Sequence, residues 1–98
     1  MSLYYLSLEG DVLKVAFGER ADSDAIVREV AETCQALKTE IMGKHLKING
    51  PATLAVAMLL AHEFGHLCKS VSFFDPKLGK YIVSISHDKS LRVGDLID

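Results

Sequence analysis

The feature that most constrains this chain is one apolar run, Pro51–His66 (PATLAVAMLLAHEFGH), in a sequence of 98 residues. Alanine, leucine and methionine dominate the run. Proline suits the first position of a helix, because its missing N–H would have no helical partner there. The run therefore predicts a helix with Gly50 as N-cap, Thr53 in the first turn and an end marked by Gly65. A helix that is apolar on nearly all sides is packed on more than one side.

The rest of the chain alternates between strand and helix patterns. Apolar residues at helical spacing after Asp22 or Ser23, which can serve as N-cap, predict an amphipathic helix that ends at Gly43. Strands are predicted where β-branched and aromatic residues gather between turn residues. The predicted strands are Tyr4–Leu8, Val12–Phe17, His45–Ile48, Val71–Asp75, Lys80–Ser86 and a short edge strand within Leu91–Asp98.

These elements follow one another in the order β-β-α-β-α-β-β. The order predicts an α/β fold with a mixed sheet, two helices and one right-handed parallel crossover in the middle β-α-β unit. Residues 1–98 suit a single small domain. Since the chain stops at Asp98 without a terminating pattern, we also consider that it is a fragment of a longer fused protein.

Charge, cysteines and hydropathy exclude several classes of partner. The net charge of −2 argues against broad nucleic-acid binding, so we expect no DNA partner. Cys34 and Cys68 both lie in apolar settings and form no CxxC, which indicates reduced thiols in a cytoplasmic protein. The longest apolar stretch, Ala52–Ala61, is too short to span a bilayer, so we expect no membrane partner.

The predicted topology gathers one set of polar residues where the central strands end. This top group lies beyond the carboxyl ends of the strands that finish at Ile48 and Asp75. Its members are Asn49, Gly50, Pro51, Thr53, Asp75 and Lys77. A glycine turn that feeds a helix N-terminus offers free N–H groups to a phosphate, and open α/β sheets bind ligands at this edge. The alternative is that both segments are only tight turns, because one glycine and one proline do not make a P-loop.

A second set lies at the opposite end of the sheet. This bottom group consists of His62, Glu63, His66 and His87. The first three form a literal HExxH, in which two histidines four apart can bind Zn²⁺ with the glutamate as base. The chain is small for a protease cleft. The alternative is a pair of histidines stabilised by the C-terminal dipole of the helix.

From Asn49 onward the chain resembles the third family of CRISPR-associated ring nucleases (the Csx-three family). About half the chain carries the resemblance, with its motifs in the family's order. The residues are Gly50-Pro51, the apolar helix into Leu60-Ala61-His62 with His66, Asp75-Pro76-Lys77-Leu78-Gly79, Ser86-His87 and Leu91-Arg92-Val93-Gly94-Asp95-Leu96-Ile97.

The resemblance implies a small oligomeric enzyme that cleaves cyclic tetra-adenylate, the second messenger of type III CRISPR defence. It also implies dependence on Mn²⁺ and activity on the 3′ ends of short RNA. By position, His62, His66 and Asp75 match candidate catalytic residues, and His87 joins the two other histidines as candidate metal ligands. Lys77 stands where a family member has arginine, and the basic residue and serine found near Asn49 in that member are missing here.

Four functions are therefore considered: a ring nuclease, a cyclic-oligoadenylate-binding module with little turnover, a minimal HExxH metallohydrolase and a structural domain. The topology adds a constraint, because it puts His62 and Asp75 at opposite ends of one sheet. A general base must lie within about 3 Å of the proton that it moves. We therefore expect a site shared between subunits, with a homodimer and a ligand-driven head-to-tail assembly.

Overall fold

The computed structural model describes residues 2–98 and contains two helices and six strands in the predicted order. Their bounds are β1 Tyr4–Glu9, β2 Val12–Phe17, α1 Ser23–Ile41, β3 His45–Asn49, α2 Leu54–Phe64, β4 Ser70–Asp75, β5 Lys80–Ser86 and β6 Leu96–Ile97. The α/β class is confirmed, and the strand predicted near the end of the sequence is β6.

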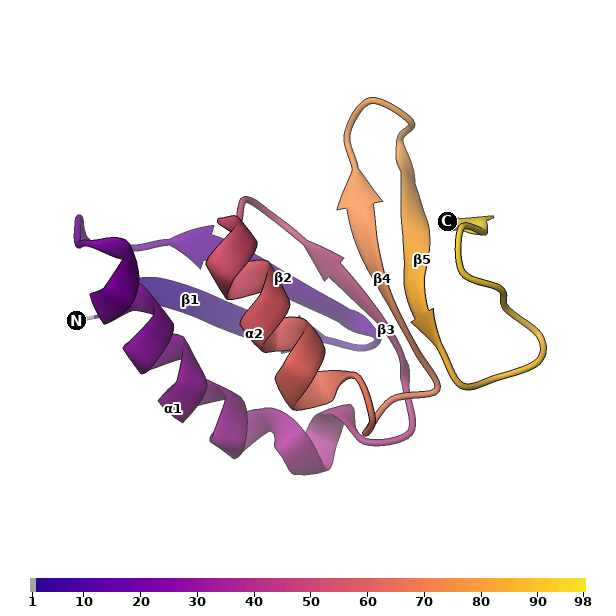
Figure 1. Ribbon diagram of the computed structural model, residues 1–98, viewed down its shortest axis with the longest axis horizontal. Helices are drawn as coiled ribbons and strands as arrows, with labels where there is room; N and C mark the ends of the chain where they lie inside the picture. The colour runs from indigo at the N-terminus through magenta and orange to yellow at the C-terminus, as the bar shows by residue number, and fades with distance from the viewer. Residues whose placement is uncertain (1) are drawn as a thin grey trace.

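The strands lie side by side in chain order, β1 to β6, in one mixed sheet. The β2–β3 and β3–β4 pairs are parallel, and the other pairs are antiparallel. The sequence predicted one parallel crossover, whereas the structure has two. Since both crossovers step across the sheet in the same direction, both helices lie on the same face, as Figure 1 shows.

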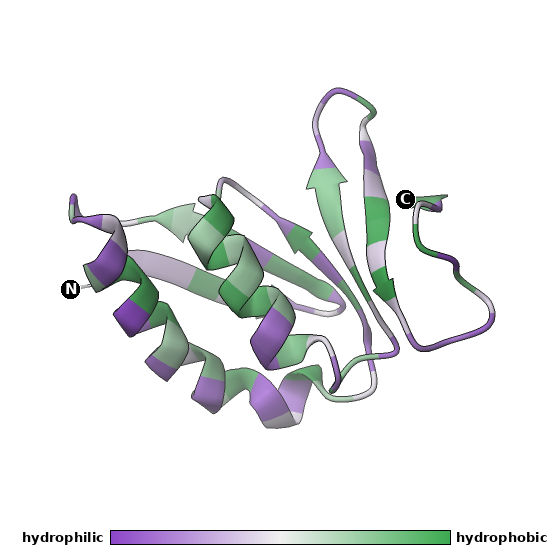
Figure 2. Ribbon diagram, in the orientation of Figure 1, coloured by the Kyte–Doolittle hydropathy of each residue, from purple (hydrophilic) through white to green (hydrophobic). Residues whose placement is uncertain are grey.

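The core fills the space between the helices and this face of the sheet. Alternate residues point into it, so Leu46 and Ile48 of β3 are buried there, whereas Lys47 points to the opposite face. Figure 2 shows hydrophobic colour along most of α2 and alternation along α1. The opposite face, here called the open face, carries no helix (Figure 1). It holds Tyr81 and Val83, which are buried but lie outside the core cluster.

The predicted start of α2 was wrong. The helix begins at Leu54, and Thr53 is its N-cap, with the Oγ1 atom accepting a hydrogen bond from Val56 N at 3.2 Å. Gly50 cannot be the cap, because its φ of +136° is far from a helical entry and its Cα lies against the Val15 carbonyl of β2. Pro51 lies in the connecting segment, where its carbonyl accepts a hydrogen bond from the Tyr4 hydroxyl at 2.5 Å.

The predicted end of α2 is confirmed. Phe64 is the last helical residue and Gly65 is the C-cap. His62 therefore lies on the last turn of the helix, whereas His66 lies in the turn that follows it.

Candidate functional site

The structure divides the top group between the two faces of the sheet. Asn49 lies at the end of β3, and its Nδ2 donates to the Tyr81 hydroxyl on the open face at 3.1 Å. Thr53 caps α2 on the helix side. Because the helix starts three residues after Pro51, the N–H groups that follow Gly50 are not those of a helix N-terminus. The proposed phosphate cradle at Gly50-Pro51 is therefore not formed in that way.

Asp75 and Lys77 belong to the tight turn that joins β4 to β5. The Asp75 Oδ1 accepts hydrogen bonds from the backbone N–H of Lys77 at 2.9 Å and of Leu78 at 3.1 Å. Lys77 is exposed. The β4–β5 hairpin projects beyond the helices (Figure 1), so both side chains lie at a protruding tip, as the hairpin-turn alternative predicted.

A cluster on the open face was missed by the sequence patterns. The Lys47 Nζ lies 5.7 Å from the centroid of the Tyr81 ring, and the Phe74 ring meets the same ring edge-on at 5.2 Å. Lys47 and Tyr81 stand on strands that are not neighbours, β3 and β5. The pairing register brings them together, and no local motif could have indicated it.

The histidines of the bottom group lie at the surface. His62, His66 and His87 are all exposed. The rings of His66 and His87 stack with centroids 5.4 Å apart, and the His87 Nε2 forms a hydrogen bond with the Gly65 carbonyl at 2.9 Å. The prediction that His87 would return to the end of α2 is therefore confirmed.

Glu63, the glutamate of HExxH, is engaged by side chains of α1. Its carboxylate forms an ion pair with Lys38 of α1 at 2.9 Å and accepts a hydrogen bond from Gln35 Nε2 at 3.2 Å. The hydrogen bond from Lys38 is the main cause that lowers the pKa of Glu63 below its ordinary value. Glu63 is thus a link between the two helices, and this geometry does not suit the base of a zinc hydrolase.

The bottom group also fits Mn²⁺ poorly. Within residues 2–98, no three histidine, cysteine, aspartate or glutamate side chains are arranged to hold a metal ion. Mn²⁺ prefers carboxylate, carbonyl and water oxygens. The carboxylate nearest in sequence to the two motif histidines belongs to Glu63, which Lys38 engages. Dependence on Mn²⁺ therefore rests on the resemblance, with no set of ligands among the described residues to support it.

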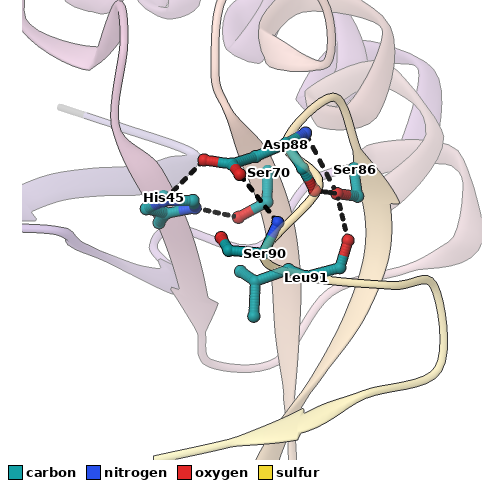
Figure 3. A network of polar contacts seen from close by, with 6 residues as sticks. All are labelled: His45, Ser70, Ser86, Asp88, Ser90 and Leu91. Atoms are coloured by element: carbon teal, nitrogen blue, oxygen red, sulfur yellow. Dashed lines mark hydrogen bonds and ion pairs between the residues drawn. The ribbon is translucent and has the colours of Figure 1, made fainter.

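A polar network that no sequence motif indicated joins His45 to Ser70 and Asp88 (Figure 3). The His45 Nδ1 lies 2.8 Å from the Ser70 Oγ, and its Nε2 lies 3.5 Å from an Asp88 carboxylate oxygen. Hydrogen bonds from Ser90 are the first cause that lowers the pKa of Asp88. Ser70 is fully buried, so it is no accessible nucleophile, and the network fastens the segment that follows β5 to the sheet.

The ends of the sheet keep the two sets of candidate residues apart. His87 N donates to the carbonyl of Lys69, directly before β4, whereas Asp75 is the last residue of that strand. Five strand steps of about 3.3 Å separate the two ends by about 17 Å. The predicted separation of Asp75 from the bottom histidines within one chain is therefore confirmed.

The fold and these positions define a small α/β domain. Exposed histidines lie at one end, and a projecting turn that carries Asp75 and Lys77 lies at the other. Comparisons with protein-family models, curated proteins and solved structures found no match. Among residues 2–98, no helix is long and apolar enough to cross a membrane.

Proposed function

We propose that this chain is a ring nuclease that cleaves cyclic tetra-adenylate at a site shared between two copies. The observation that carries the proposal is the placement of exposed His62 and His66 at one end of the domain and of Asp75 and Lys77 on a protruding turn at the other. Both ends are open to solvent, and neither end alone combines the groups that the reaction needs.

The chemistry requires an acid–base group and a positive charge. A ribose 2′-oxygen attacks the adjacent phosphorus, the bond from phosphorus to the 5′-oxygen breaks, and the products carry a 2′,3′-cyclic phosphate and a 5′-hydroxyl. His62 takes the proton from the 2′-hydroxyl, and His66 gives a proton to the leaving 5′-oxygen, since histidine exchanges protons near neutral pH. Lys77 of the other copy stabilises the charge that builds on the phosphate, and Asp75 positions the ligand.

The surface beside His62 suits contact with that other copy. Leu54, Met58 and His62 recur four residues apart on α2, so they share one face of the helix. Leu54 is 90% exposed and Met58 is 75% exposed. An exposed apolar helix face is a feature of protein–protein contact sites. Contact between this face and the hairpin of a second copy would be heterologous, and ligand would favour it.

The remaining expectations belong to the same proposal. The enzyme acts in the cytoplasm on a diffusible nucleotide and takes the 3′ ends of short RNA as a second substrate. Because residues 2–98 of one copy offer no ligand set for Mn²⁺, the dependence on Mn²⁺ that the resemblance implies would need ligands from the nucleotide or from the second copy. The domain works alone or as a fragment fused to further domains.

A binding module with little turnover is the second candidate. It is favoured by the engagement of the Asp75 carboxylate in its own turn, which leaves that group less free for chemistry. Slow or absent turnover with tight binding would be its signature.

The test is incubation of the protein with labelled cyclic tetra-adenylate, with and without Mn²⁺, and separation of the products. Linear products that end in a 2′,3′-cyclic phosphate are expected, and His62→Ala should slow their formation by about 10²–10⁴-fold. Lys89→Ala, which removes an exposed lysine outside the proposed site, is the matched control and should leave the rate unchanged. Retained binding without any cleavage would replace the nuclease with the binding module.

A further inference from the structure

A cavity of about 370 Å³ lies between the β2–α1 connection and the segment that enters α2. Its lining residues are Phe17, Gly18, Glu19, Arg20, Ala21, Ser23, Ile26 and Thr53. The two segments lie at the same end of the sheet in Figure 1, beyond the carboxyl ends of β2 and β3. This is the edge at which open α/β sheets bind ligands.

The first wall of the cavity is the β2–α1 connection, and residues near the start of the chain hold it in place. Gly18 N donates to the Leu3 carbonyl at 2.9 Å, and Glu19 N donates to the Ser2 carbonyl at 3.1 Å. A side chain at Gly18 would meet the Ser2 carbonyl at 2.2 Å, so the two segments are in close contact. The Glu29 carboxylate in turn accepts hydrogen bonds from the backbone N–H groups of Leu3 and Tyr4.

The second wall, which is the segment that enters α2, is held by contacts with β1 and β2. The Tyr4 hydroxyl donates to the Pro51 carbonyl, and the Gly50 Cα lies so close to Val15 that an added Cβ would be 1.9 Å from the Val15 carbonyl oxygen. Thr53, which follows, is fixed as the N-cap of α2. Both walls are therefore positioned before any ligand arrives, which lowers the entropic cost of binding.

Besides the carboxylate of Glu19, the lining combines three chemical functions. Phe17 is 46% exposed although its ring also packs against Tyr4, so part of the ring is free to contact a planar group. Arg20 supplies an exposed guanidinium, whose planar fork suits a phosphate. Ser23 and Thr53, which carry hydroxyl groups, also line this space. An aromatic ring, a guanidinium and hydroxyl groups are the groups that bind the base, the phosphate and the sugar of a nucleotide.

We propose that this cavity binds one purine mononucleotide, with the base against Phe17 and the phosphate on Arg20. Its volume is near the lower end of small-molecule pockets, about 300–1,000 Å³, so it suits one nucleotide and not a ring of four. The choice of adenylate rests on the proposed function, in which a single unit of the ring would enter the cavity. None of Phe17, Arg20 and Ser23 belongs to the top group.

The test uses AMP and adenosine as separate probes, followed by amide chemical shifts and by calorimetry. We expect AMP to shift the amides of residues 17–26 and Thr53. Arg20→Gln should weaken AMP binding by about tenfold and leave adenosine binding unchanged, because only AMP carries the phosphate. Phe17→Leu, which keeps an apolar side chain at a partly exposed position, should weaken both probes. Arg92→Gln, an exposed arginine outside the cavity, is the control.

The outcomes separate this inference from the proposed function. AMP shifts that are confined to other residues, or an affinity that Arg20→Gln does not change, would overturn the nucleotide pocket even if the ring is cleaved. Binding of AMP in the cavity by a protein that does not cleave cyclic tetra-adenylate would retain the pocket and remove the nuclease.

Discussion

At the scale of single residues, Glu63 shows how a motif and its geometry can disagree. The sequence HExxH suggests a metal site, but the Glu63 carboxylate reaches Lys38 and Gln35 on α1. The motif histidines point to the surface. Helical spacing predicts which residues share a face, but it cannot show that a lysine of another helix will occupy the carboxylate. The metalloprotease interpretation of this motif is therefore not supported.

Glu63→Gln should leave ring cleavage near the wild-type rate. It should reduce the free energy of unfolding near neutral pH but not in strong acid. Because the pKa of Glu63 is lowered in the folded chain, its contribution is fully present above the ordinary glutamate pKa of about 4.3 and is lost as the pH falls through the folded value. Urea denaturation at a series of pH values from 7 downward measures this. A difference between wild type and variant that does not shrink as the pH falls, or a loss of cleavage as large as that of His62→Ala, would contradict the assignment.

The network around His45 marks the limit of sequence analysis at this scale. His45 and Ser70 begin two strands that pair in register, so their contact follows from the β3–β4 ladder. Asp88 comes from a connecting segment whose path no pattern predicts. The contact between His45 and Ser70 could have been inferred from a correct strand register, but the contact with Asp88 could not.

At the scale of elements, the order and most bounds follow from the sequence. Alternation in Leu13, Val15 and their neighbours identifies β2, and helical spacing identifies α1. The second crossover was missed because only three residues of β2, Val12 to Lys14, pair with β3. A short parallel pairing leaves little trace in the pattern, since the direction of a neighbouring strand does not change which residues alternate.

The segment that enters α2 shows why its start was predicted too early. The sequence predicts Gly50 as a cap, whereas in the structure Gly50 has a positive φ and lies in close contact with the Val15 carbonyl. Proline after glycine fits a helix start and a connecting segment equally well. The contact between Gly50 and Val15 of β2 decides between them.

Gly50→Ala should destabilise the fold severely, by about 3 kcal/mol or more, because both the positive φ and the contact with the Val15 carbonyl oppose a Cβ. Gly10→Ala is the matched control. Gly10 also has a positive φ, but nothing lies within 4 Å of its Cβ position, so only a strain of about 1–2 kcal/mol is expected. If urea denaturation shows that both variants lose the same free energy of unfolding, then the close contact between Gly50 and the Val15 carbonyl is wrong.

At the scale of the whole molecule, the exposed face of α2 bears on assembly. Met58→Glu should leave the monomer folded, because the side chain is 75% exposed. It should weaken ligand-driven association about tenfold or more, since it places a charge in an apolar contact. Sedimentation with and without cyclic tetra-adenylate measures the effect. Val93→Glu, at a residue 69% exposed in the segment before β6, is the control and should assemble normally. Assembly of the Met58 variant at wild-type strength would exclude this face.

The most direct test of the shared site is complementation between two inactive variants. His62→Ala removes the bottom histidine, and Asp75→Asn removes the charge at the top while keeping an Oδ1 acceptor for the turn. In an equal mixture, about a quarter of head-to-tail contacts would join an intact His62 to an intact Asp75, so about a quarter of wild-type cleavage should return. Cleavage that stays at the level of the separate variants, while wild-type specific activity does not change with protein concentration, would contradict a site between subunits.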